Sequence, residues 1–414
     1  IAEGVVVKAA RRDVRVNLKS AYKRRLGKDL KKDINHETWQ APVLTIEQLE
    51  YVMHDLVYLP ELMEAQLKEV AGDTRAKAMT LEQALLPVVA RMVVNGLPVD
   101  KDKLQKQMDY LGGKRHKFAD NCFAVLGKQI NLNSTLQLKT AFEELGAPVG
   151  NTTAATIHNV SVHGEGPAQK FAENLLQFKK MKSRSNMYKP SFFQDNIIPT
   201  RADDYRGPGH AVHARYCQVG TDTGRFSSSE PNLQQVAGDL RTFFGIIPGN
   251  GCATLDYSQL EVRIAAWLAH DEALLNAVDA EDVHTAVASA IFGVPPEQVE
   301  KKQRKLAKAG TFTFLFGGGA NLFYETALSQ GSEMTLKDAY EFEEMFFQRF
   351  SGLAKVRAGA TIAAKTRQSV SVVMPHGLIR TLAGPTLRPT TIMNTAVLGS
   401  AASGLKQAPL LCRE

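Results

Sequence analysis

Apolar residues recur at helical spacing along most of the chain, and continuous or alternating apolar runs are few. Because residues three and four positions apart share one face of a helix, this pattern predicts a mostly helical protein. The expected helices cover 46–70, 81–94 with an interruption at Pro87, 101–126, 136–145 after a cap near Ser134, and 171–182. The segment 148–167 is rich in Gly, Asn, Thr and His and is predicted to be a loop, whereas 201–218 should combine loop and strand.

One apolar run has the pattern of a buried strand. Residues 252–255 are apolar or Thr and lead directly into Asp256, and helical spacing resumes with Leu260, Ile264 and Trp267. A carboxylate held between a strand and the start of a helix is a rigid mount for a divalent metal. A single Asp is not a site, so its meaning depends on the residues around it.

Composition restricts the class of protein. The chain has 414 residues, enough for two to four domains, and its hydrophobic fraction of 44% supports packed cores. Its net charge of +7 is mild evidence for a polyanionic partner such as nucleic acid. The four Cys are scattered without zinc spacing, which indicates reduced thiols and an intracellular, cytoplasmic protein. We expect neither secretion nor a membrane span, because no signal-peptide pattern and no long apolar run is present.

The N-terminal stretch is basic, and its cations are Lys23, Arg24, Arg25, Lys28, Lys31 and Lys32. Two interpretations stay open at this stage. The cations can form the solvated face of a helix, or they can form a patch that binds an anionic partner.

Four residues at steps of four share one side of a predicted helix: Arg304, Lys308, Phe312 and Phe316. Each step of four turns about 40° past a full circle, so they fall within an arc of about 120°. Two cations followed by two aromatics suit a triphosphate with a sugar and base behind it. The alternative is a basic surface helix whose Phe side chains belong to an ordinary core.

The same helix contains weak helix formers. Gly310, Thr311 and Thr313 lower its intrinsic stability, and three consecutive glycines from Gly317 end it. We expect its order to depend on packing or ligand, as suits an element that moves over a substrate.

A polar segment precedes the predicted strand. Residues 223–229 and 231–235 supply Arg225, Asn232 and Gln234, whose donors can reach the minor-groove acceptors that all base pairs present alike. Contact with DNA of any sequence would use such groups. A Ser-rich turn without function is the alternative.

Five segments, in order, resemble the motifs of family A (DNA polymerase I-like) DNA polymerases. Asp256–Arg263 resembles the first palm motif, and Arg304-x-x-x-Lys308-x-x-x-Phe312 resembles the fingers motif. The other three segments are similar to the TGR…PNLQ segment, the fingers DIHT motif and the palm helix; they are 223–235, 282–285 and 394–406.

The resemblance implies a role for each matching residue. Asp256, with the backbone at Tyr257, would hold two catalytic Mg²⁺ ions, and Lys308 would also act in catalysis. The residues implied to contact the incoming nucleotide are Gln259, Glu261, His284, Arg304, Lys308, Phe312 and Phe316. Those implied to contact primer and template DNA are Arg225, Asn232, Gln234, Arg241 and Asn394.

Glu261 carries a second interpretation. The resemblance implies that its side chain crowds the position of a ribose 2′-OH and so favours deoxynucleotides. The pattern Ser258-x-x-Glu261 also fits a helix capping box. The family usually has Tyr at the position of Phe316, where the hydroxyl pairs with this glutamate, so we expect altered ribonucleotide exclusion. Phe312 in the family goes with rejection of dideoxynucleotides, which we expect of the full-length protein.

The resemblance implies an α+β, mostly helical, right-hand fold preceded by a remnant of an RNase H-like exonuclease domain. Tyr51-x-x-x-Asp55 resembles the third motif of a 3′–5′ exonuclease. The expected divisions are an exonuclease remnant (1–75), the start of the palm (76–100), thumb (101–190), palm (191–267), fingers (268–383) and a truncated last part of the palm (384–414).

One family motif has no counterpart in its expected place. The second metal-binding Asp of the family lies in a His-Asp-Glu hairpin after the palm helix, whereas His270-Asp271-Glu272 follows Asp256 closely and is expected to be a surface turn. We therefore expect a fragment, truncated at both ends, of a monomeric template-directed DNA polymerase that uses primer-template DNA and deoxynucleoside triphosphates. The chain alone would be nearly inert. The alternatives are a catalytically dead primer-template-binding module and, with less support from its carboxylates, a nuclease.

Overall fold

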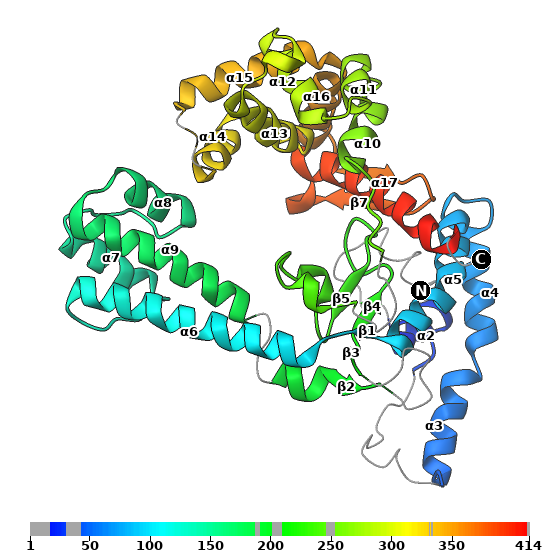
Figure 1. Ribbon diagram of the computed structural model, residues 1–414. Helices are drawn as coiled ribbons and strands as arrows, with labels where there is room; N and C mark the ends of the chain where they lie inside the picture. Colours follow the sequence, from blue (N-terminus) through cyan, green and yellow to red (C-terminus); the bar gives the residue numbers. More distant parts are fainter. Residues whose placement is uncertain are drawn as a thin grey trace. The chain divides into compact units, whose positions relative to one another are not determined.

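A computed structural model describes residues 17–29, 43–186, 191–200, 209–245, 253–330, 332 and 334–411 (Figure 1). The described chain is mostly helical, and its short strands form three small sheets. It divides into two compact units. Unit 1 comprises Ile1–Ala90, Cys217–Ser227 and Lys355–Glu414, and unit 2 comprises Arg91–Tyr216 and Ser228–Ala354. Within the described residues, none of the helices is long and apolar enough to cross a bilayer.

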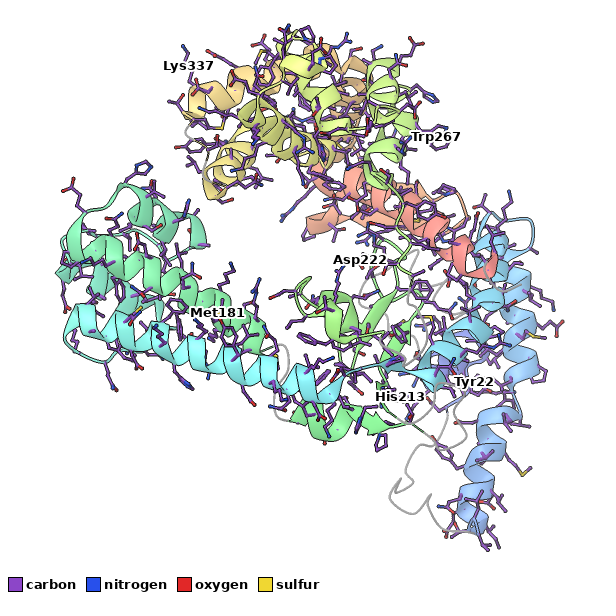
Figure 2. The ribbon with its side chains drawn as sticks, viewed as in Figure 1. Tyr22, Met181, His213, Asp222, Trp267 and Lys337 are labelled. Carbon is purple, nitrogen blue, oxygen red and sulfur yellow. The ribbon has the colours of Figure 1, made fainter. Side chains whose placement is uncertain are left out.

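Unit 1 begins with a capped helix, α2 (Leu18–Leu26). The side chain of Asn17 accepts the backbone N–H of Ser20, and Gly27 ends the helix with a φ of 67°. Tyr22 is fully buried (Figure 2) and donates its hydroxyl to the backbone carbonyl of Asp55 at 2.9 Å. This hydrogen bond ties α2 to α3 (Ile46–Leu56).

Carboxylates pair with three cations in the described part of the basic N-terminal stretch, whereas Lys31 and Lys32 lie outside the described residues. Arg25 pairs with Glu69 and Lys28 pairs with Glu61 at 2.8 Å, both on α4 (Leu59–Val70). Lys23 lies 3.2 Å from Asp29. These ion pairs favour the interpretation as an ordinary helix face over that of an anion-binding patch.

Two helix predictions in unit 1 are wrong because of proline. The expected single helix over 46–70 is two helices, since Pro60 lies in the first turn of α4, where its missing N–H leaves no hydrogen bond unmade. Pro87, by contrast, does not interrupt α5 (Arg75–Asn95). The carbonyl that Pro87 leaves without a helical partner belongs to the exposed Gln83, so water can satisfy it.

A hairpin joins the rest of unit 1. Strands β6 (Ser369–Val373) and β7 (Ile379–Ala383) pair antiparallel, with Val373 opposite Ile379. Their turn packs on the start of α5 at Gly377, whose φ is 89° and whose absent Cβ would lie 1.9 Å from the carbonyl oxygen of Thr74. Only glycine fits this close approach. The hairpin is flanked in sequence by α16 (Ser351–Thr366) and by η6 (Gly384–Thr386) and α17 (Pro389–Leu411).

An ion pair lies in the interior of unit 1. Lys406 of α17 and Glu82 of α5 are 1% and 0% exposed, and the ammonium of Lys406 contacts the Glu82 carboxylate. Gln218 donates its side-chain amide to the carbonyl of Glu82 at 2.8 Å and to its carboxylate at 3.2 Å. The Lys406 ammonium also lies 5.7 Å from the ring centre of Phe226. Three separate stretches of chain are thereby joined by one buried polar group.

Unit 2 contains a small sheet and a helical arm. The sheet has the order β1-β3-β2, with β3 (His210–Val212) antiparallel to both β1 (Leu97–Pro98) and β2 (Ile197–Pro199). A core that includes Phe192, Phe193 and Leu240 packs around it. The remaining short elements of this region are η2 (Phe192–Asn196), β4 (Arg215–Cys217), which pairs with β5 (Ser227–Ser229), η3 (Leu233–Gln235) and η4 (Arg241–Phe243).

The helical arm confirms one predicted helix and corrects another region. Helix α6 (Lys101–Leu126) has the predicted bounds, because Asp100 caps its first turn and Gly127 ends it with a φ of 67°. It packs along α9 (Gly166–Asn186), and α7 (Thr135–Glu144) begins after the predicted cap Ser134. The loop predicted over 148–167 is wrong: it contains α8 (Ala154–His163), which Ile157 anchors in the arm's core.

The remaining helices of unit 2 surround a cluster of phenylalanines. They are α10 (Leu260–Ala269), α11 (Glu272–Val278), α12 (Val283–Phe292), η5 (Pro296–Gln298), α13 (Lys301–Leu315), α14 (Ala320–Ser329) and α15 (Leu336–Arg349). Phe314 of α13 lies 5.0 Å from Phe346 and 5.3 Å from Phe323, and Phe323 stacks on Phe342 at 4.8 Å, as measured between ring centres. This cluster fixes α13 against α14 and α15.

The turn between α10 and α11 differs from its prediction. His270 to Glu272 do form a turn, but Asp271 is only 4% exposed. Its carboxylate accepts the backbone N–H of Leu274 at 3.0 Å and that of Leu353 at 3.1 Å. Asp271 is therefore a buried structural cap, and the prediction of a surface turn is wrong for this residue.

Candidate functional site

Helix α13 presents the predicted stripe of cations and aromatics. Arg304 and Lys308 are exposed and Phe312 is half-buried on the same side, whereas Ala307, Gly310 and Phe314 are buried on the other. Phe316 is the half-buried C-terminal cap residue of the helix. The structure thus leaves both charged groups available to a ligand, and the core is made by a different phenylalanine, Phe314.

The weak helix formers of α13 lie on its buried face. The hydroxyls of Thr311 and Thr313 donate to the carbonyls of Ala307 and Ala309, four residues back, at 2.7 and 2.8 Å. A Cβ on Gly310 would lie 2.6 Å from the ring of Phe342. The helix is therefore held by close packing at the positions where its own propensity is low. Its movement over a substrate stays a prediction.

The start of α12 faces the cations of α13. Asp282 caps α12 by accepting the backbone N–H of His284 at 3.1 Å and the hydroxyl of Thr285 at 2.7 Å. The same carboxylate accepts Nε of Arg304 at 2.6 Å and Nη2 of Arg304 at 3.2 Å. These hydrogen bonds, among which those from Arg304 have the largest effect, hold the pKa of Asp282 well below its usual range. Asp282 is ionised at neutral pH, and both of its carboxylate oxygens accept hydrogen bonds from one edge of the Arg304 guanidinium.

His284 lies beside this pair. Its side chain is 4% exposed, and its ring centre is 5.9 Å from that of Phe312. Burial, followed by the charges of Lys308 and Arg304, lowers the pKa of His284, so the ring is neutral at pH 7. Its buried Nδ1 has no hydrogen-bond partner among the residues that the structure describes. A buried polar atom of this kind is a site at which a ligand or water completes the hydrogen bonding.

The structure corrects the prediction for the segment before α10. Residues 253–257 form no strand; they are extended or irregular and exposed, and Leu255 is 87% exposed. A strand needs a hydrogen-bonded neighbour, and none of the described strands pairs with this segment. Asp256 and Tyr257 therefore lie on an exposed stretch just ahead of the helix. Cys252 is outside the described residues.

The start of α10 also decides one alternative. Gln259 is the cap residue, with a φ of 53° and no side-chain capping hydrogen bond, and Glu261 lies in the first turn. The capping box proposed for Ser258 and Glu261 is thus wrong, because the helix begins one residue later than that motif requires. The role of Glu261 as a sugar gate stays a prediction.

The prediction that Asp256 and the backbone at Tyr257 hold metal ions stays a prediction. Asp256 is exposed, and Glu261 follows it five positions later in the sequence. Among the described residues there is no group of three or more His, Cys, Asp or Glu side chains that could hold a metal. A tightly held divalent cation takes several oxygen ligands. The described residues by themselves do not supply the donor set of a two-metal centre.

Arg225 lies in a tightly bonded turn of unit 1. Its backbone N–H donates to the hydroxyl of Thr221 at 2.9 Å, and Asp222 pairs with Arg380 of β7 at 3.0 Å. A Cβ on Gly224, whose φ is 74°, would lie 2.7 Å from Leu378. The hairpin β6–β7 thus fixes the turn that carries Arg225. The other predicted DNA contact in this unit, Asn394, is half-buried on α17.

Three predicted DNA contacts belong to unit 2. The side chain of Asn232 accepts the backbone N–H of Gln234 at 3.1 Å and so caps η3. Arg241 lies on η4 and donates from Nε to the carbonyl of Val236 at 3.3 Å. Asn232 therefore has a structural role of its own, and the DNA contacts of all three residues stay predictions.

The two candidate exonuclease residues, Tyr51 and Asp55, share one helix, α3. Their positions four residues apart place them on one face. The described structure links the backbone of Asp55 to Tyr22, as above, and shows no cluster of carboxylates around it. Their exonuclease origin stays a prediction.

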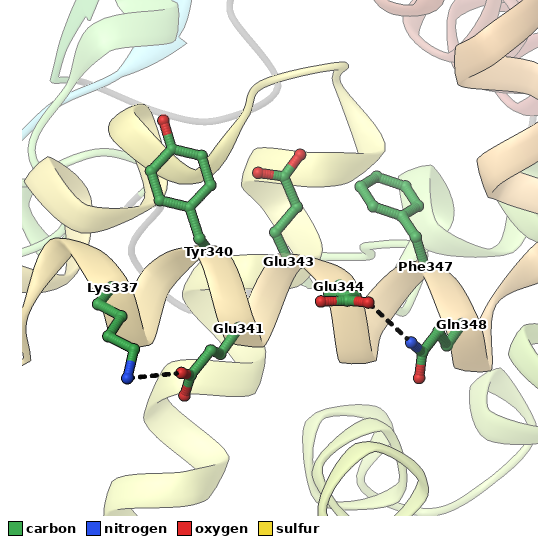
Figure 3. A pocket seen from close by; sticks show the side chains of 7 residues that line it. All are labelled: Lys337, Tyr340, Glu341, Glu343, Glu344, Phe347 and Gln348. Carbon is green, nitrogen blue, oxygen red and sulfur yellow. Dashed lines mark hydrogen bonds and ion pairs between the residues drawn. The ribbon is translucent and has the colours of Figure 1, made fainter.

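An open hollow of about 730 Å³ lies away from these residues, along α15 (Figure 3). Its lining comes from a single helix and includes Tyr340, Glu343 and Phe347. The Lys337–Glu341 and Gln348–Glu344 pairs drawn there are ordinary contacts between successive helical turns. The hollow contains none of the predicted site residues, and we assign it no ligand.

Comparison with known proteins agrees with this arrangement. The family model for DNA polymerase family A matches residues 101–410. The chain belongs to DNA polymerase family A. It is 27% identical over 379 residues to DNA polymerase I of Bacillus subtilis, covering 87% of this chain and 41% of that protein. It is 31% identical over 326 residues to the thermostable DNA polymerase I of Thermus thermophilus, covering 75% and 37%. The chain thus spans less than half the length of either relative.

A solved structure confirms the right-hand polymerase fold. The POL domain of Pol1 from M. smegmatis, in complex with DNA primer-template and dNTP, matches 99% of this chain and 70% of its own chain with a TM-score of 0.77. Its sequence identity of 23% supports the fold alone. The predicted α+β, mostly helical fold class is confirmed, whereas the boundaries of palm, thumb and fingers stay predictions.

Sequence reasoning missed one residue of this site. Asp282 lies in the DIHT-like segment 282–285 and has no role implied by the resemblance, although an Asp followed closely by a helix is a recognisable N-cap. What the sequence could not indicate is the ion pair with Arg304, which lies 22 positions later.

Proposed function

We propose that this chain is the nucleotide- and DNA-binding part of a template-directed DNA polymerase that adds deoxynucleotides to a primer 3′ end. The observation that carries the proposal is the shared face of α12 and α13, where Arg304, Lys308, His284 and Phe312 gather. Two cations suit a triphosphate, and the half-buried ring of Phe312 suits a sugar. Membership of DNA polymerase family A supports the assignment.

We propose DNA contacts within each unit, taken by itself. In unit 1 these are Arg225 and Asn394, and in unit 2 they are Asn232, Gln234 and Arg241. The bound primer-template and dNTP in the related M. smegmatis domain support this choice of partners. The net charge of +7 favours the same polyanion, and binding should weaken steeply with salt.

Primer extension requires metal ions in addition to bound DNA and nucleotide. Polymerases use two metal ions, which clamp the attacking and leaving oxygens. The described residues supply Asp256 but not the further carboxylates that would complete such a centre. We propose that the chain binds DNA and nucleotide without extending a primer, and that Asp256 is one of the residues that would hold Mg²⁺.

Two assays run side by side test the proposal. Fluorescence anisotropy measures binding of a labelled primer-template, and primer extension with Mg²⁺ and all four dNTPs measures synthesis. Binding without extension is expected. Extension by the chain itself would refute the inactivity, absence of binding would refute the function, and metal-dependent degradation of the primer 3′ end would favour a nuclease.

A matched pair of variants tests the nucleotide site. Lys308→Ala removes a cation from the stripe, whereas Lys302→Ala removes an exposed cation from the first turn of the same helix, about 120° away around its axis. Calorimetric titration with dATP should show weaker binding, by about tenfold, only for Lys308→Ala. Equal losses would mean that the helix attracts nucleotides through net charge rather than through a site.

A further inference from the structure

We propose that Asp282 is a positioning residue, which holds the guanidinium of Arg304 in the orientation that receives a phosphate group of the nucleotide. The inference rests on the proposed function and adds a residue to that site. It concerns a carboxylate that has the same charge as the ligand, so its presence beside a triphosphate site needs a physical reason.

The geometry of the ion pair supplies that reason. Arg304 contacts Asp282 through Nε and Nη2, which form the side edge of the guanidinium. A guanidinium has five N–H donors in a rigid plane, and a side-on pair uses two of them. The end edge, formed by Nη1 and Nη2, then points away from the carboxylate. A phosphate can bind this edge through two parallel hydrogen bonds while Asp282 stays in place.

Asp282 is itself held rigidly. Its two carboxylate oxygens accept the backbone N–H of His284 and the hydroxyl of Thr285 in addition to Arg304. The cap on α12 fixes the backbone that carries His284, and the same carboxylate fixes Arg304 on α13. Asp282 therefore sets the relative position of two predicted phosphate-binding side chains that come from different helices.

The unpaired Nδ1 of His284 is an independent observation at the same place. This atom is buried, and the charges of Lys308 and Arg304 both act on the ring. A buried hydrogen-bonding atom next to two cations fits an anion that completes the arrangement. His284, Lys308 and Arg304 would therefore serve one anionic ligand together, and Asp282 orients one of them.

A competing idea makes the opposite prediction. If Asp282 merely occupied Arg304 until nucleotide displaced it, removal of its charge would strengthen binding of the anionic triphosphate. If Asp282 positions Arg304, removal of its charge weakens binding. The sign of the change therefore distinguishes positioning from competition.

The experiment measures dATP binding to the 414-residue chain by isothermal titration calorimetry. Asp282→Asn keeps a side-chain oxygen that can cap α12 but removes the charge that holds Arg304. We expect the Kd for dATP to rise about tenfold, with an unchanged Kd for primer-template DNA. Asp100→Asn is the matched control, because Asp100 also caps a helix and pairs with a lysine, and it should leave the Kd for dATP unchanged.

A double-mutant comparison separates positioning from a structural role. In an Arg304→Ala background, Asp282→Asn should cause no further loss of dATP binding, because the group that it positions is gone. A loss of equal size in both backgrounds, unchanged binding, or tighter binding by Asp282→Asn would each overturn the inference. The proposed function fails, and the inference with it, if the unmodified chain does not bind dATP. The same holds if Arg304→Ala and Lys308→Ala bind dATP with the Kd of the unmodified chain.

Discussion

Replacement of Lys406 by Met should destabilise unit 1 strongly. Both members of the Lys406–Glu82 pair are at most 1% exposed. At an ordinary ion-pair separation of about 2.8 Å and an effective dielectric constant of about 20, their attraction is about 6 kcal/mol. Burial costs several kcal/mol for each ion, so the intact pair contributes little net stability. Lys406→Met, however, leaves the buried Glu82 with hydrogen bonds from Gln218 but no cation, so Glu82 must stay an unpaired anion or take up a proton, which costs about 3–5 kcal/mol.

Hydrogen exchange followed by mass spectrometry can assign this loss to one unit. Peptides from α5 and α17 should exchange faster by about two to four powers of ten, while peptides from α6 keep their protection. The double variant Glu82→Gln/Lys406→Met should recover most of the protection, since no unpaired charge is left. Lys128→Met is the control: its pair with Glu144 is 2.7 Å long but exposed, and should matter by less than about 1 kcal/mol.

Two outcomes would refute this reasoning. Unchanged exchange in Lys406→Met would mean that water reaches Glu82 freely. An equal loss in the single and double variants would mean that Lys406 acts through its packing, including its position over Phe226, rather than through its charge.

Three further predictions concern other features of the fold. Burial, followed by the charge of Lys406, lowers the pKa of His376 to about 4, whereas the value in the unfolded chain is about 6.5. Between these two pH values the unfolded state therefore binds more protons than the folded state. The free energy of unfolding should fall by up to about 3 kcal/mol as the pH drops from 6.5 to 4. Denaturation curves at several pH values should show this slope, and His376→Gln should reduce it. Gly377→Ala should destabilise unit 1 by more than about 1 kcal/mol, because the new Cβ meets Thr74. Gly112→Ala is the control: its Cβ meets nothing within 4 Å, so the change should stabilise α6 by up to about 1 kcal/mol. Thermal melts that show no difference between the two variants would contradict the close approach at Gly377. Gly310→Ala should weaken dATP binding along with stability, because a Cβ 2.6 Å from Phe342 displaces α13 and its cations; unaltered calorimetric titrations would show that the helix has room to adjust.

The sequence alone determines those helices that have local capping residues or a regular spacing of side chains. Helix α6 has its predicted bounds, and Asp100 and Gly127 cap it locally. Helix α10 follows from apolar spacing, and the stripe on α13 follows from cations and aromatics four residues apart. The family also follows from the sequence, since five of its motifs occur along the chain in the order that the family has.

Tertiary structure decided features that depend on distant partners. The predicted strand 252–255 is apolar or Thr, but none of the described strands pairs with its described part. Pro87 lies inside α5, and the carbonyl that it leaves without a helical partner belongs to the exposed Gln83. The burial of Asp271, the Glu82–Lys406 pair and the hold of Asp282 on Arg304 each join residues far apart in sequence. A charged residue is solvated by default, and only the fold shows where a partner 22 or 324 positions away compensates for the loss of water.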